Sequence, residues 1–456
     1  MTVRFKKTQP PAADNSGVMI SLTDETIEKR RNNLLHLMQE KGITSLVIYA
    51  DKEHGSNFEY LVGFIPRFEE AILVLNIDKT STLILGNENY NKAQYSRIKS
   101  MSKKSSLFSL PNQPMGSIET SEDIFAETNI DASGLVGLVG WKLIPGMKVQ
   151  FDIPEFIVQA LTSVINREKL VNATDLFISP KYGARITNNA NEIAHYEYGA
   201  SLASDAVLEA MDVLEINKSE LEIGETLTKH GQYNTVVTIA AFGQRFVDGN
   251  LYPTHNRLQK GNKVALTTGY RGGLSSRSGY AVENISELEE VDKNYFDEVV
   301  VPYFEAYHYW LTNIKIGENA GEFYKKFEEY YPQAKYGWEL CPGHLTAEEE
   351  WMSSLFYKDS DATVQSGMIF QVDFIPSQPN HNGVSAESTL ALADKKLRNE
   401  IKEQYPDLWE VIEKRRKYMR DELNIHLPDE VLPLANTLGY YRPFFLDKKY
   451  SLYIDE

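Results

Sequence analysis

The chain has 456 residues, of which 42% are hydrophobic and 24% are charged, so it can form a large core and is not globally disordered. Its 64 acidic residues outnumber its 47 basic ones, and the net charge of −17 argues against a nucleic-acid or anionic-membrane surface, which needs clustered cations. The single cysteine excludes an intramolecular disulfide and a cysteine-rich metal site. Because no apolar leader or membrane-spanning run is present, the sequence predicts a soluble, cytoplasmic protein.

The first part of the chain alternates between helical and strand-like segments. Residues 1–17 are predicted to be a disordered leader. A helix is predicted within residues 21–43, with Thr23 as its N-cap and Gly42 as its stop. Short runs rich in β-branched residues predict strands at 45–50, 71–77, 81–86 and 134–141, and a helix is predicted at 155–166. This alternation predicts an α/β domain over residues 18–175.

The second part of the chain is richer in strands. A linker leads into a long helix that ends near residue 211. Strands are predicted at 236–242, 263–270, 367–375 and 388–394, around a helical block at 295–314. Residues 185–395 are therefore predicted to form an α+β domain. A charged helix over 395–423 and an aromatic tail follow, and residues 396–456 are expected to pack on the body of the protein.

The segment VALTTGYRGGLSSRSGY, residues 264–280, is typical of a β-hairpin. Glycines at 272–273 supply the positive φ angles of a two-residue turn. With the turn there, Thr267 would lie directly opposite Ser278, on a face that Ser276 shares. Neutral hydroxyl groups are weak ligands for divalent ions, so this face is well placed for a metal but poorly equipped to bind one.

Two further features have a simple structural interpretation. Arg277 alternates to the other face of the hairpin, which predicts a salt bridge at the surface or between layers. The acidic run at 348–350 is predicted to be a solvated loop. Neither feature points to chemistry by itself.

Several segments occur in the order and spacing of one known family. They are NFEYLVGF (57–64), NEIAHYEYGASLASDA (191–206), NLYPTHNRLQKGNKVALTTG (250–269), GWELCPGHLTAEEEW (337–351), SGMIFQVDFIP (366–376) and GVSAESTLALAD (383–394). The chain resembles the creatinase, aminopeptidase P and prolidase family. The resemblance implies a non-catalytic α/β N-terminal domain, a C-terminal α+β domain with the "pita-bread" fold, and a homodimer.

The resemblance also implies where a metal site would lie. In the metallopeptidases of this family, two aspartates, a histidine and two glutamates bind two divalent ions. Those positions fall on Thr267, Ser278, His344, Asp373 and Glu387, so both aspartates are replaced and one glutamate is shortened. We predict a degenerate metal site. His344, Asp373 and Glu387 are its predicted catalytic residues, and they are also the predicted ligands if a single Mn or Zn ion binds.

Other family positions differ as well. The auxiliary histidines of the peptidases fall on Asn250 and Trp351, and the histidine and hairpin acid of creatinase fall on Asn250 and Tyr280. His255 lies close enough in sequence to replace the lost histidine. In this family Arg67 would reach the site of a partner subunit. The predicted substrate-binding residues are therefore Asn250, His255, Thr267, Ser278, Tyr280 and Arg67.

Three functions are compatible with these residues. The first is a hydrolase that cleaves a C–N bond of a small amino-acid-like or amidino compound without metal, with His344 as general acid and base. The second is an Xaa-Pro aminopeptidase with a reduced metal site, and the third is a ligand-binding protein without turnover. The expected partner is a small molecule or short peptide, with no nucleic acid and no membrane. No cofactor is expected, and Mn or Zn is the alternative.

Overall fold

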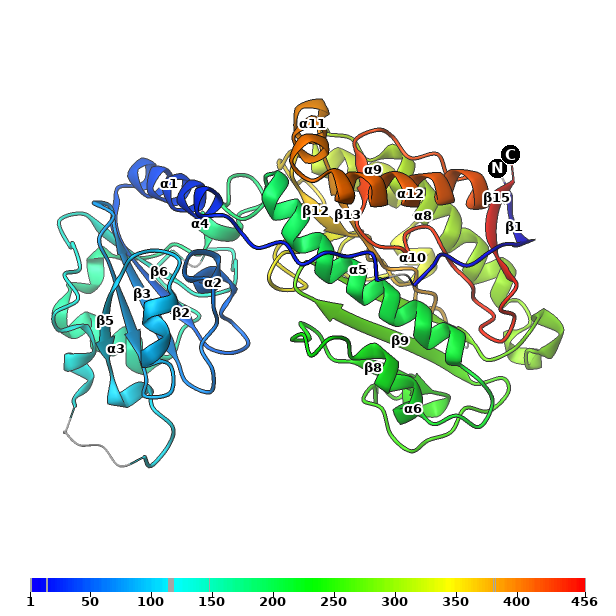
Figure 1. The fold of residues 1–456 in the computed structure, drawn as a ribbon, viewed down its shortest axis with the longest axis horizontal. Helices are drawn as coiled ribbons and strands as arrows, with labels where there is room; N and C mark the ends of the chain where they lie inside the picture. Colours follow the sequence, from blue (N-terminus) through cyan, green and yellow to red (C-terminus); the bar gives the residue numbers. More distant parts are fainter. Residues whose placement is uncertain are drawn as a thin grey trace. The chain divides into compact units, whose positions relative to one another are not determined.

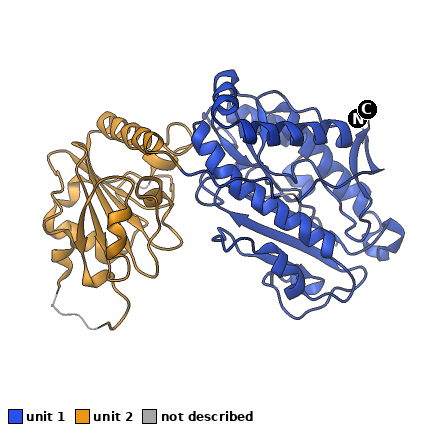
Figure 2. Cartoon of the chain, viewed as in Figure 1, with its two compact units in different colours: residues 1–21, 187–456 blue, residues 22–186 orange. Residues whose placement is uncertain are grey.

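The computed structural model describes residues 2–13, 15–113, 119–146, 148–379, 381 and 383–455. The chain forms two compact units, coloured separately in Figure 2: residues 22–186, and residues 1–21 together with 187–456. The first unit extends past its predicted end at residue 175, because the hydroxyl of Tyr60 donates to the carbonyl of Ala184 at 2.8 Å. Among the described residues, no helix is long and apolar enough to cross a bilayer.

The first unit is built on one mixed sheet of six strands, in the order β5-β4-β3-β2-β6-β7 (Figure 1). The strands are β2 (Ile43–Ala50), β3 (Ala71–Asn76), β4 (Ser81–Leu85), β5 (Met101–Lys104), β6 (Leu135–Val139) and β7 (Leu170–Asn172). The helices are α1 (Asp24–Lys41), α2 (Ser56–Val62), α3 (Glu155–Val164) and α4 (Asp175–Ile178). Every residue of β3 is buried, which indicates that both faces of the sheet are covered.

Helix α1 begins and ends at the predicted residues. The side chain of Thr23 accepts a hydrogen bond from the backbone N–H of Thr26, and Gly42 takes the left-handed conformation at φ 67°. A polar N-cap and a C-terminal glycine satisfy backbone groups that the helix itself leaves open. These local signals do not depend on tertiary contacts, and the prediction is confirmed.

The second unit carries two larger sheets. One has the order β10-β9-β8 and the other β11-β12-β13-β14. Their strands are β8 (Ile239–Phe242), β9 (Lys263–Tyr270), β10 (Gly273–Tyr280), β11 (His344–Leu345), β12 (Ile369–Gln371), β13 (Thr389–Leu392) and β14 (Val431–Pro433). The two sheets meet where Ser278 of β10 bridges to Ser385, just before β13.

Helices surround these sheets. They are α5 (Ala190–Val213), α6 (Glu220–Gly224), α7 (Gln244–Val247), α8 (Val301–Asn313), α9 (Ala320–Tyr330), α10 (Gln333–Tyr336), α11 (Lys395–Gln404) and α12 (Pro406–Leu423). Helix α5 lies along β9 and β10 (Figure 1). The single C-terminal helix predicted over 395–423 is two helices. Proline 406 lacks an N–H and disfavours a helical conformation at Tyr405, so α11 ends and α12 begins there.

The N-terminal segment forms a strand, so the prediction of a disordered leader is wrong. Strand β1 (Thr2–Lys7) pairs antiparallel with β15 (Tyr450–Asp455), from Thr2 opposite Asp455 to Lys7 opposite Tyr450. Figure 1 shows the two ends of the chain side by side. The ring of Phe5 stacks on Phe296 and Phe444, with centroids 4.8 and 5.3 Å away. Contacts with the far end of the chain therefore order a segment that has little local preference.

The variant Phe5→Ala is expected to lower the free energy of unfolding by about 2 kcal/mol. It removes two stacked ring contacts, each worth about 0.5–1.5 kcal/mol, together with part of the buried apolar area. The variant Arg4→Ala is the matched control on the same strand. Its ion pair with Asp455 is solvent-exposed, so its loss should cost at most about 1 kcal/mol. Equal stabilities in urea unfolding of the wild type and Phe5→Ala would contradict the structural role of β1.

Candidate active site

The β9–β10 hairpin turns one residue earlier than its sequence predicts. Gly273 pairs with Tyr270, so the turn residues are Arg271 and Gly272. Gly272 has φ 106°, and a Cβ there would lie 2.0 Å from the carbonyl oxygen of Tyr196 on α5. The positive φ and the close approach of α5 both require glycine at position 272. Because two glycines are adjacent in the sequence, the sequence alone did not show which of them occupies this turn position.

This shift changes which side chains oppose one another. Thr267 lies opposite Ser276, and their hydroxyl oxygens are 2.7 Å apart; the predicted direct pairing with Ser278 is wrong. Ser278 remains on the same face by alternation along β10. Its hydroxyl donates to the carbonyl of Gly383 at 3.0 Å. The hydroxyl groups of Thr267, Ser276 and Ser278 thus bond to neutral groups of the protein.

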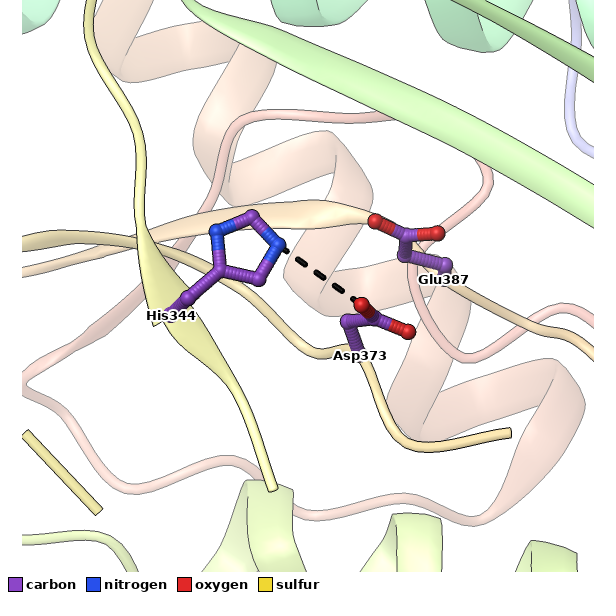
Figure 3. A group of neighbouring side chains, drawn as sticks. All are labelled: His344, Asp373 and Glu387. Atoms are coloured by element: carbon purple, nitrogen blue, oxygen red, sulfur yellow. Dashed lines mark ion pairs between the residues drawn. The ribbon is translucent and has the colours of Figure 1, made fainter. Parts of the chain in front are cut away.

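The three predicted catalytic residues come together in the second unit (Figure 3). His344 opens β11, Asp373 follows β12, and Glu387 precedes β13. One ligand atom from each lies within 4.8 Å of those of the other two. Figure 3 shows the imidazole pointing toward the two carboxylates, with Nε2 of His344 3.7 Å from Oδ2 of Asp373. Neighbouring antiparallel strands place the residues, because β11, β12 and β13 are adjacent in one sheet.

The protein fixes the orientation of the imidazole of His344. Its Nδ1 lies 3.3 Å from the carbonyl oxygen of Leu345. A carbonyl only accepts hydrogen bonds, so Nδ1 carries a proton and the neutral ring has its lone pair on Nε2. The ring is fully buried and stacks on the indole of Trp351, with centroids 4.0 Å apart. Histidines that bind metals commonly donate their other N–H to a backbone carbonyl in this way.

A fourth acidic residue reaches the cluster from a loop. Oε1 of Glu350 lies 3.0 Å from Nε2 of His344, but without the alignment of a hydrogen bond. Glu350 is half-buried, whereas the nearby Glu348 is buried and accepts a hydrogen bond from the hydroxyl of Tyr196 at 2.6 Å. The prediction that residues 348–350 form a solvated loop is therefore wrong. A run of three acids is usually exposed, and only the folded chain shows that two of them turn inward.

Gln371 holds the carboxylate of Glu387. Its side-chain N–H₂ donates to Oε1 of Glu387 at 3.2 Å and to the carbonyl of Leu274 at 3.0 Å. Its oxygen accepts from the hydroxyl of Thr389, which fixes the orientation of the amide. Sequence reasoning did not select Gln371, although it lies two residues before Asp373 and alternation along an extended chain places both on one face.

Burial and mutual repulsion outweigh the positive charge near the acidic side chains, although Arg277 lowers the pKa of Glu387 and His344 lowers that of Asp373. Burial raises the pKa of the Asp373 carboxyl to about 6, with Glu350 adding to the effect and His344 opposing it. Burial also raises the pKa of Glu387 well above its usual value, and Asp373 and Glu350 raise it further. For His344, burial alone would lower the pKa, but the carboxylates of Glu350 and Asp373 outweigh it and the pKa is raised. The cluster thus favours the presence of additional positive charge.

Arg277 is fully buried, and its partners among the described residues are carbonyl and hydroxyl oxygens and not carboxylates, so the predicted salt bridge is wrong. Its guanidinium donates to the carbonyl of Glu387 at 2.9 Å and of Tyr440 at 3.0 Å, and to the hydroxyl of Ser388 at 3.2 Å. It also donates to the carbonyls of Ser276 and Thr437. A guanidinium carries five N–H donors, and here they join β10, the chain at Glu387 and the C-terminal segment.

The remaining predicted substrate-binding residues do not join the cluster. Asn250 and His255 are exposed on the segment between α7 and β9, and none of the described contacts links them to His344. Tyr280 is buried, and its hydroxyl donates to Oδ1 of Asp292 at 2.6 Å. Arg67 is exposed in the first unit, with its guanidinium over the ring of Phe68. Their roles in substrate binding stay predictions.

The residues present fit one divalent ion. Three side chains with nitrogen or oxygen donors suffice for a catalytic Zn²⁺ site that keeps a position open for water. Nε2 of His344 is a buried polar atom that finds no hydrogen-bond partner, and it faces the carboxylates. Thr267 and Ser278 carry no carboxylate, so a second ion would lack the charged oxygen ligands that it needs. The donor set therefore favours a single ion.

Solved structures of peptidases share this fold. No family model matches the chain, and no curated protein matches its sequence. A prolidase from Thermococcus sibiricus is 16% identical with a TM-score of 0.63, covering 82% of this chain and 96% of that one. A dipeptidase from Mycobacterium ulcerans is 14% identical with a TM-score of 0.62, covering 82% and 94%. An X-Pro aminopeptidase from Thermotoga maritima is 16% identical with a TM-score of 0.61, covering 80% and 95%.

These similarities show the fold. The chain has the pita-bread fold of the prolidases and X-Pro aminopeptidases, with an α/β N-terminal unit, and the predicted fold class is confirmed. At such low identity the similarity does not by itself carry an activity from those enzymes to this chain.

Proposed function

We propose that this protein is a hydrolase that cleaves the peptide bond of short Xaa-Pro peptides, with one divalent ion held by His344, Asp373 and Glu387. The observation that carries the proposal is the convergence of these three donors within 4.8 Å. It is supported by the shared fold, since solved structures that have it include a prolidase and an X-Pro aminopeptidase. Bound divalent ions polarise carbonyl groups and lower the pKa of water, and both effects serve amide hydrolysis.

Other residues of the protein orient the side chains of Glu387 and His344 and shield the imidazole from water. Gln371 keeps the carboxylate of Glu387 directed into the cluster, and Leu345 keeps the lone pair of His344 on Nε2. The indole of Trp351 covers one face of the imidazole, so solvent reaches the ring from fewer directions. Side chains held by such contacts need little reorganisation when a substrate binds.

A second candidate is hydrolysis of a small C–N compound without metal, with His344 as general acid and base. The observation that favours it is the pair of carboxylates, Glu350 and Asp373, on the Nε2 side of the imidazole. Carboxylates placed there would stabilise an imidazolium ion in the absence of any metal. A third candidate, ligand binding without turnover, uses the same residues. The homodimer, the cytoplasmic location and the absence of nucleic-acid and membrane partners stay predictions.

Chelation separates these candidates. We expect the purified protein to contain stoichiometric Mn²⁺ or Zn²⁺, to hydrolyse Xaa-Pro dipeptides, to lose that activity in EDTA and to regain it when the ion is returned. Metal content is measured by mass spectrometry, and a panel of dipeptides and amidines is screened in parallel. Turnover of an amidine that resists EDTA would support the metal-free hydrolase instead. Tight metal binding with no turnover across both panels would support the binding protein.

A further inference from the structure

The loop that follows β11 folds back on the strand that carries His344. The backbone N–H of Leu345 donates to the carbonyl of Ser353 at 2.8 Å, and the N–H of Met352 donates to the carbonyl of Leu345 at 2.9 Å. The hydroxyl of Thr346 closes the loop inside this pair by donating to the carbonyl of Glu349 at 3.0 Å. Residues 346–352 are therefore held next to the imidazole by hydrogen bonds on both sides of the loop.

This loop is also attached to other parts of the second unit. The N–H of Gly272, in the hairpin turn, donates to the carbonyl of Ala347 at 2.7 Å. Glu348 is anchored to Tyr196 of α5, as described above. These contacts hold Ala347 and Glu348, and the loop then places Glu350 at the edge of the imidazole and Trp351 on its face. The position of Glu350 is thus built into the fold and is not that of a freely moving surface acid.

The lone pair on Nε2 of His344 and the carboxylates of Glu350 and Asp373 lie close together and repel one another. In the neutral ring this nitrogen presents a lone pair, because Nδ1 is the donor to Leu345. Carboxylate oxygens of Glu350 and Asp373 lie 3.0 and 3.7 Å from it. A buried lone pair beside two negative charges is unfavourable, and a proton on Nε2 or a cation bound among the three groups would relieve the repulsion. Two ligand atoms that each lie about 2.1 Å from one ion at right angles are about 3.0 Å apart, so the separation of Nε2 and Oε1 of Glu350 also suits a shared ion.

We infer that Glu350 is a fourth ligand residue of the divalent ion, supplied by the loop in place of the carboxylates absent at Thr267 and Ser278. This inference rests on the proposed metal site. Glu350, which contacts Nε2 of His344, would then be added to the three converging residues His344, Asp373 and Glu387. The set would contain one neutral nitrogen and three carboxylates. Oxygen-rich sets of this kind suit Mn²⁺.

The test compares Mn²⁺ affinity in three proteins by calorimetry: the wild type, Glu350→Gln and Glu349→Gln. Glu349 offers the same change of charge one residue away, so it is the matched control. We expect Glu350→Gln to weaken Mn²⁺ binding by about 100-fold, which is the upper range for loss of a supporting group around a metal. Glu349→Gln should leave the affinity unchanged. Thermal unfolding of the metal-free proteins checks that both variants fold.

A second readout reports the ligands directly. The visible absorption of bound Co²⁺ depends on the number and type of its ligands, so its spectrum should change in Glu350→Gln and not in Glu349→Gln. The variant Glu350→Asp keeps the charge but withdraws the carboxylate, and a ligand role predicts weaker binding and an altered spectrum there too. If both Glu350 variants keep the wild-type affinity and spectra, the inference about Glu350 is wrong, and the proposed site of His344, Asp373 and Glu387 is unaffected. Failure of the wild type to bind Mn²⁺ or Co²⁺ would overturn both the inference and the proposed metal site.

Discussion

Replacing His344 with alanine is expected to abolish stoichiometric metal binding and to lower kcat/KM on Xaa-Pro dipeptides by about 10³-fold. Among the three converging residues, only His344 offers a nitrogen atom as a metal ligand. This atom, Nε2, is the one that both Glu350 and Asp373 approach. Its removal leaves acidic groups that repel one another, and groups acting directly in such reactions contribute about 10²–10⁴-fold. Calorimetry with Mn²⁺ and steady-state kinetics measure the two effects.

The matched control for this variant is His36→Ala. His36 is exposed on α1, where it approaches Glu40 of the same helix, and its loss should change neither quantity. Because His344 is buried against Trp351, unfolding of the metal-free variant is measured as well. A folded His344→Ala protein with wild-type Mn²⁺ affinity would rule out the proposed site. If Mn²⁺ binding were lost and EDTA-resistant turnover persisted, the ion would not be part of the reaction.

The variant Arg277→Met is expected to lower the free energy of unfolding by about 4 kcal/mol. Methionine fills part of the space but leaves the carbonyl of Tyr440 without its donor, and an unsatisfied buried acceptor costs about 1–3 kcal/mol. It also removes one of the donors to the carbonyls of Glu387 and Thr437, and each hydrogen bond from a charged group contributes about 1.5–3 kcal/mol. Arginine is suited to this position because its planar fork of donors serves several acceptors at once. Urea unfolding followed by circular dichroism measures the loss.

The variant Arg257→Met is the control for removal of an arginine. Arg257 is exposed and donates to the carbonyl of Asn217, so its removal should cost less than about 1 kcal/mol. Arg277→Lys should fall between the two, because one ammonium cannot reach acceptors on three segments. If Arg277→Met lowers the free energy of unfolding no more than Arg257→Met does, the hydrogen bonds of the Arg277 guanidinium do not stabilise the fold as expected.

Sequence reasoning located the elements whose signals are local. The ends of α1 follow from Thr23 and Gly42, and strands β2, β3, β4 and β6 of the first unit follow from short apolar runs. Strands β5 and β7 were not predicted. It also selected His344, Asp373 and Glu387, because a family resemblance and three residues of suitable chemistry pointed to the same places. These inferences needed no knowledge of how distant segments meet.

Apart from the break between α11 and α12 at Pro406, which is a local signal, the following errors concern contacts between segments distant in sequence. The alternation of Val3 and Phe5 with polar residues is a strand signal, but the partner of β1 lies at the other end of the chain. The hairpin register depended on the approach of α5 to Gly272, which the local sequence does not reveal. Glu350 carries no sequence signal at all, because only the folding back of its loop brings it to His344.

The pairing of β1 with β15 has a consequence for how the protein is made. Residues 22–186 leave the ribosome as one continuous segment and can form their sheet during synthesis, whereas β1 has no partner until residues 450–455 emerge. The edge of β1 must stay unpaired until residues 450–455 have been made. Its cationic side chains at Arg4, Lys6 and Lys7 discourage wrong pairing during that interval. The sheet of the second unit that contains β1 is thus completed only after the segments between these two strands have been made.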